Sequence, residues 1–449
     1  MRGLKREVQD NGRLPYSLPD RIPDIPSHFC YRVPDMSLVK DPSLAPTGAV
    51  KMAWARENMP VLDRIFRRLN SKRTLRGHKI AMCLHLEAKT AALAEDLHKA
   101  GAEVSITGSN PLSTQDDVAA ALSKTGVNVF AWRGVSDKDH QLNLKRVLSL
   151  TPDVIIDDGA ELSIAAHEKG QPALSKILGA CEETTTGVTR LKAFENQKKL
   201  RFPVIAVNDA PTKFLFDSRY GTGQSGLEGI MRATNLLLAG RNVVIGGYGW
   251  VGRGVALRAK GMGSRVIITE VDPVRALEAL MEGCDVMPMD EAAKIGDLFI
   301  TATGGTDIIT AKHFRKMKDK AILANVGHFD VEVKVKDLER IAAKKRQVRA
   351  EVTEYTLDRG KRLYLLSQGR LVNLAAADGH PAEVMDMSFA DQALSAEYLI
   401  KNGATLGPRV IPVPQDIDRE VASQRLQAFG KQIDKLTTVQ EKYTQSWKL

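Results

Sequence analysis

Three glycines, Gly247, Gly249 and Gly252, stand between two apolar runs and form the most specific chemical pattern in the chain. In such a pattern the first glycine permits a tight turn, the second lets backbone approach a pyrophosphate, and the third lets a helix pack closely on its strand. The N-terminus of that helix offers free N–H groups to phosphate oxygens. Glu270 ends the second apolar run, where a carboxylate can accept a hydrogen bond from a ribose 2′-hydroxyl. The pattern predicts a site for NAD in preference to NADP, with Arg275 as the one opposing feature.

Polar clusters follow the apolar runs of the first half of the chain. Each cluster alone has an ordinary explanation, since Ser or Asp can cap a helix and paired Asp residues can form a turn. Together they indicate more, because open α/β sheets bind ligands at the carboxyl ends of their strands. We therefore expect a polar substrate pocket that faces a nicotinamide. The clusters are residues 85–90, 110–116, 157–161, 182–187 and 208–217.

The elements that must position these residues alternate between apolar runs and helical stretches. This alternation predicts an α/β protein with two Rossmann-like, doubly wound parallel-sheet domains. A C-terminal helical extension is expected to follow them. The predicted strands are 80–84, 104–106, 127–130, 154–156 and 204–207 in the first unit, and 243–245, 298–303 and 321–324 in the second.

The expected domain limits follow from shifts in composition. The first 50 residues carry seven prolines and little periodicity, which predicts an extended or disordered arm. The second unit begins near the glycine-rich segment 221–229. We expect a proline-rich arm at 1–50, a substrate-binding domain at 51–217 and 380–412, an NAD-binding domain at 218–379, and a helical tail at 413–449.

Four apolar residues in the tail recur at helical spacing, namely Leu426, Phe429, Ile433 and Leu436. They predict a helix with one apolar stripe, which another surface must cover. The stripe could fold onto its own subunit or dock on a neighbouring subunit, and the sequence favours neither arrangement.

The composition argues against several classes of protein. No run of about 18 apolar residues occurs, so no membrane span is expected. The four cysteines lack paired spacing and no His/Cys cluster has zinc-ligand spacing, which indicates a reducing cytoplasm and no bound metal. Despite a net charge of +10, the basic residues alternate with acids and lack interleaved aromatic residues. Nucleic-acid binding is therefore not expected.

From about residue 50 to the C-terminus, these clusters and their order resemble the S-adenosylhomocysteine hydrolase (adenosylhomocysteinase) family. The short C-terminus is similar to that of compact members from archaea and some thermophilic bacteria. The segments that carry the resemblance are 85–90, 110–116, 157–159, 182–187, 208–209, 213, 216–217, 220–221, the glycine pattern, 327–330, 369–373 and 379–381.

The resemblance implies reversible hydrolysis of S-adenosyl-L-homocysteine to adenosine and L-homocysteine. In this family NAD oxidises the ribose 3′-hydroxyl to a ketone, which acidifies the C4′ hydrogen. Homocysteine then leaves by elimination, water adds, and the ketone is reduced again, so NAD is recycled within each turnover. The resemblance further implies a cytoplasmic homotetramer that acts in the methyl cycle.

Catalytic roles follow by position from the same resemblance. Lys213, paired with Asp217, is expected to take the 3′-hydroxyl proton, for which a lysine needs desolvation or a flanking positive charge near neutral pH. Asp158 is expected to move the C4′ proton, and Glu183 to hold ribose hydroxyls. His85 is expected to handle the protons on the departing sulfur and the incoming water.

Binding roles are implied in the same way. His328 and Phe329 match a mobile gate, His380 lies near the nucleobase, and Asn208 contacts nicotinamide and Lys213; His328 and His380 could equally be ordinary histidines at a domain seam. The expected substrate-binding residues are Glu87, Lys89, Ser113, Thr114, Gln115, Asn208, His328, Phe329 and His380. The expected cofactor-binding residues are Thr184, Thr185, Thr186, Gly247, Gly249, Gly252, Glu270, Asn325 and Asn373.

Several positions depart from the family pattern. Ser218 stands where the family usually has Asn, Thr222 where many members have Cys, and Arg275 where Asn is usual. A hydroxyl can replace one amide hydrogen bond but not two. The Lys and Tyr that longer members send into a neighbouring NAD site are not recognisable in this tail.

Glu87 and Lys89 depart most sharply, at the positions implied to read the nucleobase. An ionised Glu only accepts hydrogen bonds and Lys only donates them. Hypoxanthine fits this pair through its N1–H and O6, which suggests S-inosyl-L-homocysteine as an alternative substrate. Adenine also fits, through its N6 amine and N1, and a third possibility is that the two side chains pair with each other.

Two alternatives of a different kind remain open. Ser218 and the proline-rich arm fit a catalytically silent relative that acts as a binding or regulatory protein. The chain could also be a plain NAD dehydrogenase that releases NADH. Retention of the expected catalytic residues argues against the silent relative.

Overall fold

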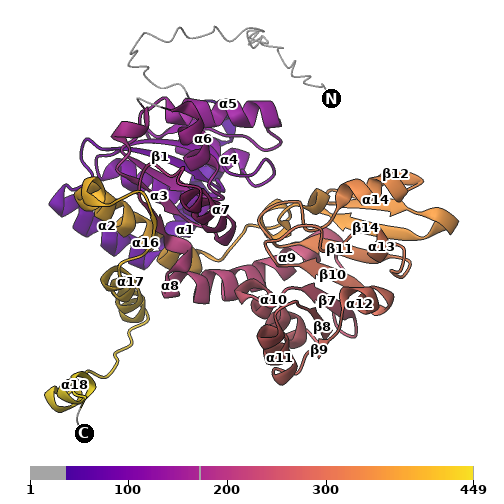
Figure 1. Cartoon of the computed structure of the whole chain (residues 1–449). Coiled ribbons are helices and arrows are strands. Elements are labelled where there is room, and N and C mark those ends of the chain that lie inside the picture. The colour runs from indigo at the N-terminus through magenta and orange to yellow at the C-terminus, as the bar shows by residue number, and fades with distance from the viewer. Residues whose placement is uncertain (1–36, 171–172, 448–449) are drawn as a thin grey trace, which may run out of the picture. The chain divides into compact units, whose positions relative to one another are not determined.

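The computed structural model describes residues 37–170 and 173–447, and its strands form two sheets (Figure 1). The first sheet has seven parallel strands in the order β15-β6-β5-β4-β1-β2-β3. This arrangement confirms the predicted α/β class. The strands are β1 (Lys79–Leu84), β2 (Glu103–Gly108), β3 (Asn128–Phe130), β4 (Val154–Asp157), β5 (Gly179–Glu182), β6 (Val204–Ala206) and β15 (Val410–Pro412).

Apolar side chains explain why these strands form. The centres of β1, β2, β4, β5 and β6 are buried, as expected for a parallel sheet with helices on both faces. The five apolar runs predicted for this unit are all strands. Strand β5 was not predicted, because it is four residues long and made largely of small side chains.

Helices surround this first sheet. Helix α16 is the longest and carries many buried polar side chains in addition to its apolar ones. The helices are α1 (Ala45–Glu57), α2 (Pro60–Lys72), α3 (Ala88–Lys99), α4 (Asp116–Leu122), α5 (Asp137–Leu148), α6 (Glu161–Lys169), α7 (Thr185–Asn196), α8 (Pro211–Lys213), a π-helix (Phe214–Gly221), α16 (Ala382–Asn402) and α17 (Gln415–Ala428).

The prediction of an extended arm up to residue 50 is wrong for residues 42–50. A short 3₁₀ helix covers Pro42–Leu44, and α1 begins at Ala45 with a proline in its first turn, where proline is tolerated. Met52 and Ala55 on α1 are buried, so packing stabilises the helix. Residues 1–36 of the predicted arm lie outside the described residues.

The second sheet has eight strands in the order β12-β13-β14-β11-β10-β7-β8-β9. Its edge β12-β13-β14 is antiparallel and the remaining pairs are parallel. The strands are β7 (Asn242–Gly246), β8 (Arg265–Thr269), β9 (Asp285–Val286), β10 (Leu298–Thr301), β11 (Ala321–Asn325), β12 (Lys344–Arg349), β13 (Val352–Thr356) and β14 (Arg362–Leu366). The helices are α9 (Thr222–Thr234), α10 (Trp250–Gly261), α11 (Pro273–Met281), α12 (Met289–Ile295), α13 (Ala311–Phe314), α14 (Val335–Ile341) and α15 (Val372–Ala375).

The predicted amphipathic helix across residues 426–436 is wrong. Helix α17 ends at Ala428, and Gly430 adopts a φ of +65°, a backbone conformation that terminates the helix. Residues 431–437 are not helical, and α18 (Thr438–Gln445) follows. The apolar side chains of Phe429, Ile433 and Leu436 are exposed.

None of the helices in the described ranges combines the length and apolar character that a membrane crossing requires.

Close contact between α9 and its neighbours explains the glycine-rich segment 221–229, which is helical. A Cβ at Gly223 would lie 2.6 Å from the backbone of Gly254, and a Cβ at Gly229 would lie 2.4 Å from the carbonyl oxygen of Val372. These glycines let α9 approach α10 and α15. Helix α9 therefore packs directly on α10 and α15 at its glycines.

Gly254→Ala is expected to lower the free energy of unfolding by roughly 1–3 kcal/mol, because its Cβ would lie 1.8 Å from the carbonyl oxygen of Arg219. Gly261→Ala, at the end of the same helix with no atom within 4 Å, is the matched control. We expect the control to keep its stability or gain up to about 1 kcal/mol. Chemical denaturation measures both variants, and equal effects would contradict this account of the packing of α10 against the π-helix Phe214–Gly221.

Candidate functional site

A cavity of about 480 Å³ lies at the carboxyl ends of strands from both sheets. Side chains that follow β1, β4, β5 and β6 line it, together with the glycine-rich turn after β7 and the loops after β10 and β11. The predicted site residues that line the cavity are His85, Glu87, Asp158, Glu183, Thr184, Thr185, Thr186, Asn208, Lys213, Asp217, Gly249, His328, Asn373 and His380.

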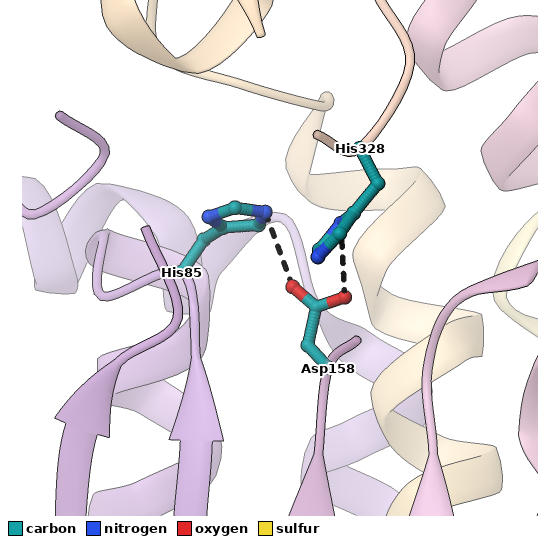
Figure 2. A group of neighbouring side chains, drawn as sticks. All are labelled: His85, Asp158 and His328. Carbon is teal, nitrogen blue, oxygen red and sulfur yellow. Dashed lines mark ion pairs between the residues drawn. The ribbon is translucent and has the colours of Figure 1, made fainter. Parts of the chain in front are cut away.

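Asp158 lies between two histidines on one wall of the cavity (Figure 2). Its Oδ2 lies 3.1 Å from His85 Nε2, and its Oδ1 lies 3.6 Å from His328 Nδ1. The hydroxyl of Ser109 donates a hydrogen bond of 3.0 Å to the same Oδ2. A carboxylate and two imidazoles in this arrangement can exchange protons with a bound substrate.

Two hydroxyls orient the His85 ring. Its Nδ1 lies 2.8 Å from Ser113 Oγ and 3.2 Å from Ser109 Oγ. Burial lowers the pKa of His85 to about 4, which the Asp158 charge only partly offsets. The ring is therefore neutral near pH 7, and Ser113 contacts His85 instead of lining the cavity.

Glu182 holds the backbone that presents Asp158. Its carboxylate accepts hydrogen bonds from the N–H groups of Gly159 (2.8 Å), Ala160 (2.9 Å) and Thr184 (3.0 Å). Gly159 and Ala160 both have positive φ values, of +85° and +62°. Burial, together with the neighbouring carboxylates, raises the pKa of Glu182 well above its usual range. We missed this positioning role, although Glu182 stands directly before a predicted site residue.

Lys213 occupies a buried ionic cluster. Its Nζ lies 3.0 Å from Asp217 Oδ1 and 3.8 Å from Glu183 Oε1. Burial lowers the pKa of Lys213, but the two carboxylates outweigh burial and leave the pKa above its ordinary value. Lys213 is therefore desolvated, as a lysine base near neutral pH requires. Its neighbours, however, are carboxylates, whereas positive charges would be needed to lower its pKa further.

His380 continues this cluster. Its Nδ1 lies 2.9 Å from Asp217 Oδ2, and its Nε2 lies 2.9 Å from Thr222 Oγ1. Burial would raise the pKa of Asp217, but His380 and Lys213 hold it well below its usual range. Thr222 thus orients the imidazole, and Ser218 also lines the cavity.

Glu183 receives two neutral donors from α16. Ser388 donates through its hydroxyl (2.5 Å) and Gln392 through its amide (2.6 Å). Burial raises the pKa of Glu183 to about 7, and Lys213 limits the rise. Sequence reasoning missed Ser388 and Gln392. The sequence signal that could have found them is the presence of polar residues within a long helix that is otherwise largely apolar.

The glycine-rich turn has the geometry that a dinucleotide requires. Gly247 adopts a φ of +95°, and Gly249 precedes α10, whose first N–H groups border the cavity. Across the cavity, the buried Oδ1 of Asn373 has no hydrogen-bond partner among the described residues. An amide or hydroxyl of a bound dinucleotide would satisfy this atom, so the residues present fit NAD.

Glu270 and Asn325 act on backbone and do not line the cavity. Glu270 accepts from the N–H groups of Tyr248 (2.7 Å) and Val271 (2.7 Å), so it ties the turn to the end of β8. The Asn325 amide donates to the carbonyl oxygens of Gly327 (3.0 Å), Phe329 (2.9 Å) and Gly369 (3.0 Å). Asn325 therefore holds the loop that carries His328.

A further carboxylate shapes the cofactor side and was not predicted. Glu332 accepts hydrogen bonds from the backbone N–H groups of Thr303 (2.9 Å) and Gly304 (2.8 Å). Thr303 and Gly304 border the cavity. Glu332 thus fixes the part of the wall next to Thr186, and no sequence motif around Glu332 predicts this role.

Glu87 and Lys89 pair with each other, the third possibility that the sequence allowed. Lys89 Nζ lies 2.5 Å from Glu87 Oε2 and donates to the carbonyl oxygen of Asp378 (2.7 Å). Glu87 also caps α3 by accepting from the N–H groups of Lys89 (3.0 Å) and Thr90 (3.1 Å). A neighbouring cavity of about 530 Å³ contains Lys89 and shares Glu87 with the first.

The remaining predicted residues lie beside the main cavity and not on its lining. Gln115 borders the neighbouring cavity, Thr114 is buried beside Gly108, and Phe329 packs edge-on against His328. Asn208 lines the main cavity and bonds to Thr185 (3.1 Å). The predicted residues outside the main lining are Lys89, Ser113, Thr114, Gln115, Phe329, Gly247, Gly252, Glu270 and Asn325.

Family models and individual relatives point to the same protein family. Residues 36–173 match the family model for S-adenosyl-L-homocysteine hydrolase, and residues 218–379 match that for its NAD binding domain. The chain is 56% identical over 418 residues to S-inosyl-L-homocysteine hydrolase of Methanocaldococcus jannaschii, which covers 93% of this chain and 99% of that one. It is 54% identical over 411 residues to adenosylhomocysteinase of Saccharolobus solfataricus, covering 91% and 98%. It is also 55% identical over 412 residues to adenosylhomocysteinase of Aquifex aeolicus, and the match covers 92% of this chain and 99% of that one.

The His85 ring is expected to titrate near pH 4, because burial disfavours its charged form. Its folded pKa lies below the unfolded value of about 6.5, so the neutral ring stabilises the fold above pH 6.5 and this contribution is lost as pH falls through 4. Histidine-selective NMR measures the midpoint, with the His85→Gln variant assigning the resonance. A midpoint near 6.5 would contradict the described burial.

Proposed function

Since the chain belongs to the S-adenosyl-L-homocysteine hydrolase family, we propose that it catalyses the NAD-dependent, reversible hydrolysis of S-adenosyl-L-homocysteine to adenosine and L-homocysteine. One observation carries the proposal. A single cavity contains two proton-handling groups, Lys213–Asp217 and His85–Asp158, beside a dinucleotide turn. This combination suits a reaction that couples hydride transfer to proton removal.

NAD, held by the glycine-rich turn, Thr184–Thr186 and Asn373, supplies a reversible hydride acceptor for the ribose C3′. The chain must move the proton of the 3′-hydroxyl at the same time. Lys213 is an ammonium beside Glu183, whose pKa of about 7 suits a proton acceptor. In our proposal Lys213 receives the hydroxyl proton as it passes one of its own to Glu183.

His85 and Asp158 serve the later steps. Oxidation at C3′ acidifies the C4′ hydrogen, and Asp158 accepts this proton. Neutral His85 exchanges protons with the leaving sulfur and with the incoming water. Leu84, Phe214 and Phe389 line the same cavity and limit the entry of bulk water while the carbonyl exists.

The decisive experiment supplies purified protein with S-adenosyl-L-homocysteine, without added NAD, and follows free thiol. Thiol release without net NADH supports the hydrolase. No thiol release from NAD-loaded protein would favour the catalytically silent alternative. Steady NADH accumulation without thiol release would favour the plain dehydrogenase.

Lys213→Ala should lower thiol release by at least about 10²-fold, because it removes the proton carrier at the 3′-hydroxyl. We expect NAD to remain bound, because Lys213 is not part of the glycine-rich turn. Protein-bound NAD, measured after denaturation and release, provides the control. Normal turnover by this variant would refute the proposed role of Lys213.

S-inosyl-L-homocysteine is a second candidate substrate, and Glu87 favours it. Once the Thr90 hydroxyl turns away from Glu87 Oε1 (3.2 Å), Glu87 can accept the N1–H of hypoxanthine, whereas N1 of adenine is itself an acceptor. Lys89 uses two of its three donors on Glu87 and Asp378, which leaves one for a 6-oxo group. The relatives include both S-inosyl- and adenosyl-specific names, so overall similarity does not choose between the bases.

Glu87→Gln is expected to lower the ratio of kcat/KM for the inosyl substrate over the adenosyl substrate by roughly 10-fold or more. The amide can donate to adenine N1, which a carboxylate cannot. Glu87→Gln also weakens the N-terminal cap of α3. This effect should change kcat/KM equally for both substrates, which differ only in the base, so it cancels in the ratio of the two values. An unchanged ratio would show that Glu87 does not read the base.

We further infer that the chain assembles as a homotetramer and acts in the cytoplasm, within the methyl cycle. Exposed apolar side chains at Phe429, Ile433 and Leu436 support association of the tail with another subunit. The buried free thiols of Cys83 and Cys181 fit a reducing compartment.

A further inference from the structure

Helix α8, which ends at Lys213, packs against α16 and α17 (Figure 1). One polar side chain from each of these helices joins a common hydrogen-bonded cluster. The Thr212 hydroxyl lies 2.7 Å from Asp391 Oδ2 and 2.5 Å from Asp418 Oδ1. The same Asp418 oxygen accepts the backbone N–H of Thr212 (2.8 Å). None of the three residues lines the main cavity, although Thr212 directly precedes Lys213 in the chain.

A count of the available hydrogens shows that one of the two carboxyl groups carries a proton. A hydroxyl has a single hydrogen to donate, so Thr212 can donate to only one of its two carboxyl partners. Both contacts are short, so the second one needs a hydrogen of its own. Only a protonated carboxyl group can supply it, by donating to the hydroxyl oxygen of Thr212.

Asp391 is the partner that holds this proton. Its side chain is fully buried, and its Oδ1 has no hydrogen-bond partner among the described residues, which makes a negative charge there costly. Burial raises the pKa of Asp391 well above its usual range, and the carboxylates of Asp418 and Glu183 raise it further. Asp418 is only half-buried and lies in the first turn of α17, where the helix dipole favours a negative charge. Asp391 therefore donates to Thr212, which donates to Asp418.

These hydrogen bonds hold the short helix that presents Lys213. Helix α8 has three residues, and the chain continues from Lys213 into the π-helix that carries Asp217. A helix this short gains little stability from its own hydrogen bonds. The contacts of Thr212 with α16 and α17 therefore help to keep Lys213 directed toward Asp217 and Glu183. A displacement of a reacting group by about 1 Å can lower a rate by about 10²-fold.

We propose that Asp391, in its protonated form, is a positioning residue for Lys213, and that it acts through Thr212 together with Asp418 of α17. The neutral acid is the active form, because its ionisation would leave two carboxylates with one hydroxyl hydrogen between them. Helix α17, near the C-terminus, thereby supports the reaction. The proton on Asp391 stands independently of the reaction, whereas the effect on rate rests on the proposed function.

Infrared difference spectra between the NAD-loaded wild-type enzyme and Asp391→Asn, without substrate, test the proton directly. We expect the variant to lose the carbonyl stretch of a protonated carboxyl group at neutral pH, a band that shifts in D₂O. Asp319→Asn is the matched control, because Asp319 is an exposed carboxylate paired with Arg362 (2.8 Å), and it should lose carboxylate stretches only. Loss of carboxylate stretches in Asp391→Asn would show that Asp391 is ionised and would overturn the proposal.

Thr212→Val, which removes the shared hydroxyl, is expected to lower kcat for thiol release by at least about 10-fold, with little change in KM or in bound NAD. Thr212→Ser should restore kcat because it restores the hydroxyl, and Asp391→Asn should keep most of it because its neutral amide can donate to Thr212.

Thr353→Val is the matched control for the rate measurement, because it removes a buried hydroxyl that bonds to Gln347 (3.3 Å) at the edge of the second sheet. Wild-type kcat in Thr212→Val, an equal loss in Thr353→Val, or an inactive Asp391→Asn would overturn the positioning role. If the wild-type enzyme releases no thiol, the proposed function fails, and the infrared spectra still decide whether Asp391 carries a proton.

Discussion

The buried ammonium of Lys213, held between Asp217 and Glu183, is the interaction on which the rest of the cavity depends. Removing one partner from a buried ion pair typically costs about 3–5 kcal/mol, because an uncompensated charge remains. Each carboxylate in this cluster therefore has a further partner. His380 pairs with Asp217, and Ser388 and Gln392 of α16 donate hydrogen bonds to Glu183. The result is a proton carrier and a proton acceptor in contact, shielded from bulk water.

The surroundings of the His85–Asp158 pair also satisfy its polar groups, here through burial and neutral hydroxyls instead of opposite charges. Burial keeps His85 neutral, and serine hydroxyls decide which nitrogen carries its hydrogen. The neutral ring therefore presents the lone pair of Nε2 to the Asp158 carboxylate at 3.1 Å, and a proton on its way to or from a substrate can lie between them.

Buried carboxylates that do not line the cavity support its walls. Glu182, Glu332 and Asp157 each accept several backbone N–H groups at the ends of strands. These bonds fix loops in conformations that the loop residues would not adopt alone, such as the positive φ of Ala160. The rigid scaffold is thus polar where it supports the site and apolar where it supports the sheets.

Local pattern by itself predicted the strands β1–β4, β6–β8, β10 and β11, the dinucleotide turn, and the polar segments after β1, β4, β5 and β6 that line the cavity. These features depend on hydrophobic periodicity and on the polar residues directly after each strand, which are short-range properties. The prediction of a tail helix across residues 426–436 was wrong, because the helix ends before Gly430 although the apolar residues continue at helical spacing beyond it. Only the tertiary structure decided the contributions of Ser388, Gln392, Glu332 and the Glu87–Lys89 pair, and the convergence of His85, Asp158 and His328. These contacts join segments far apart in the chain, and no local pattern encodes the distance between them.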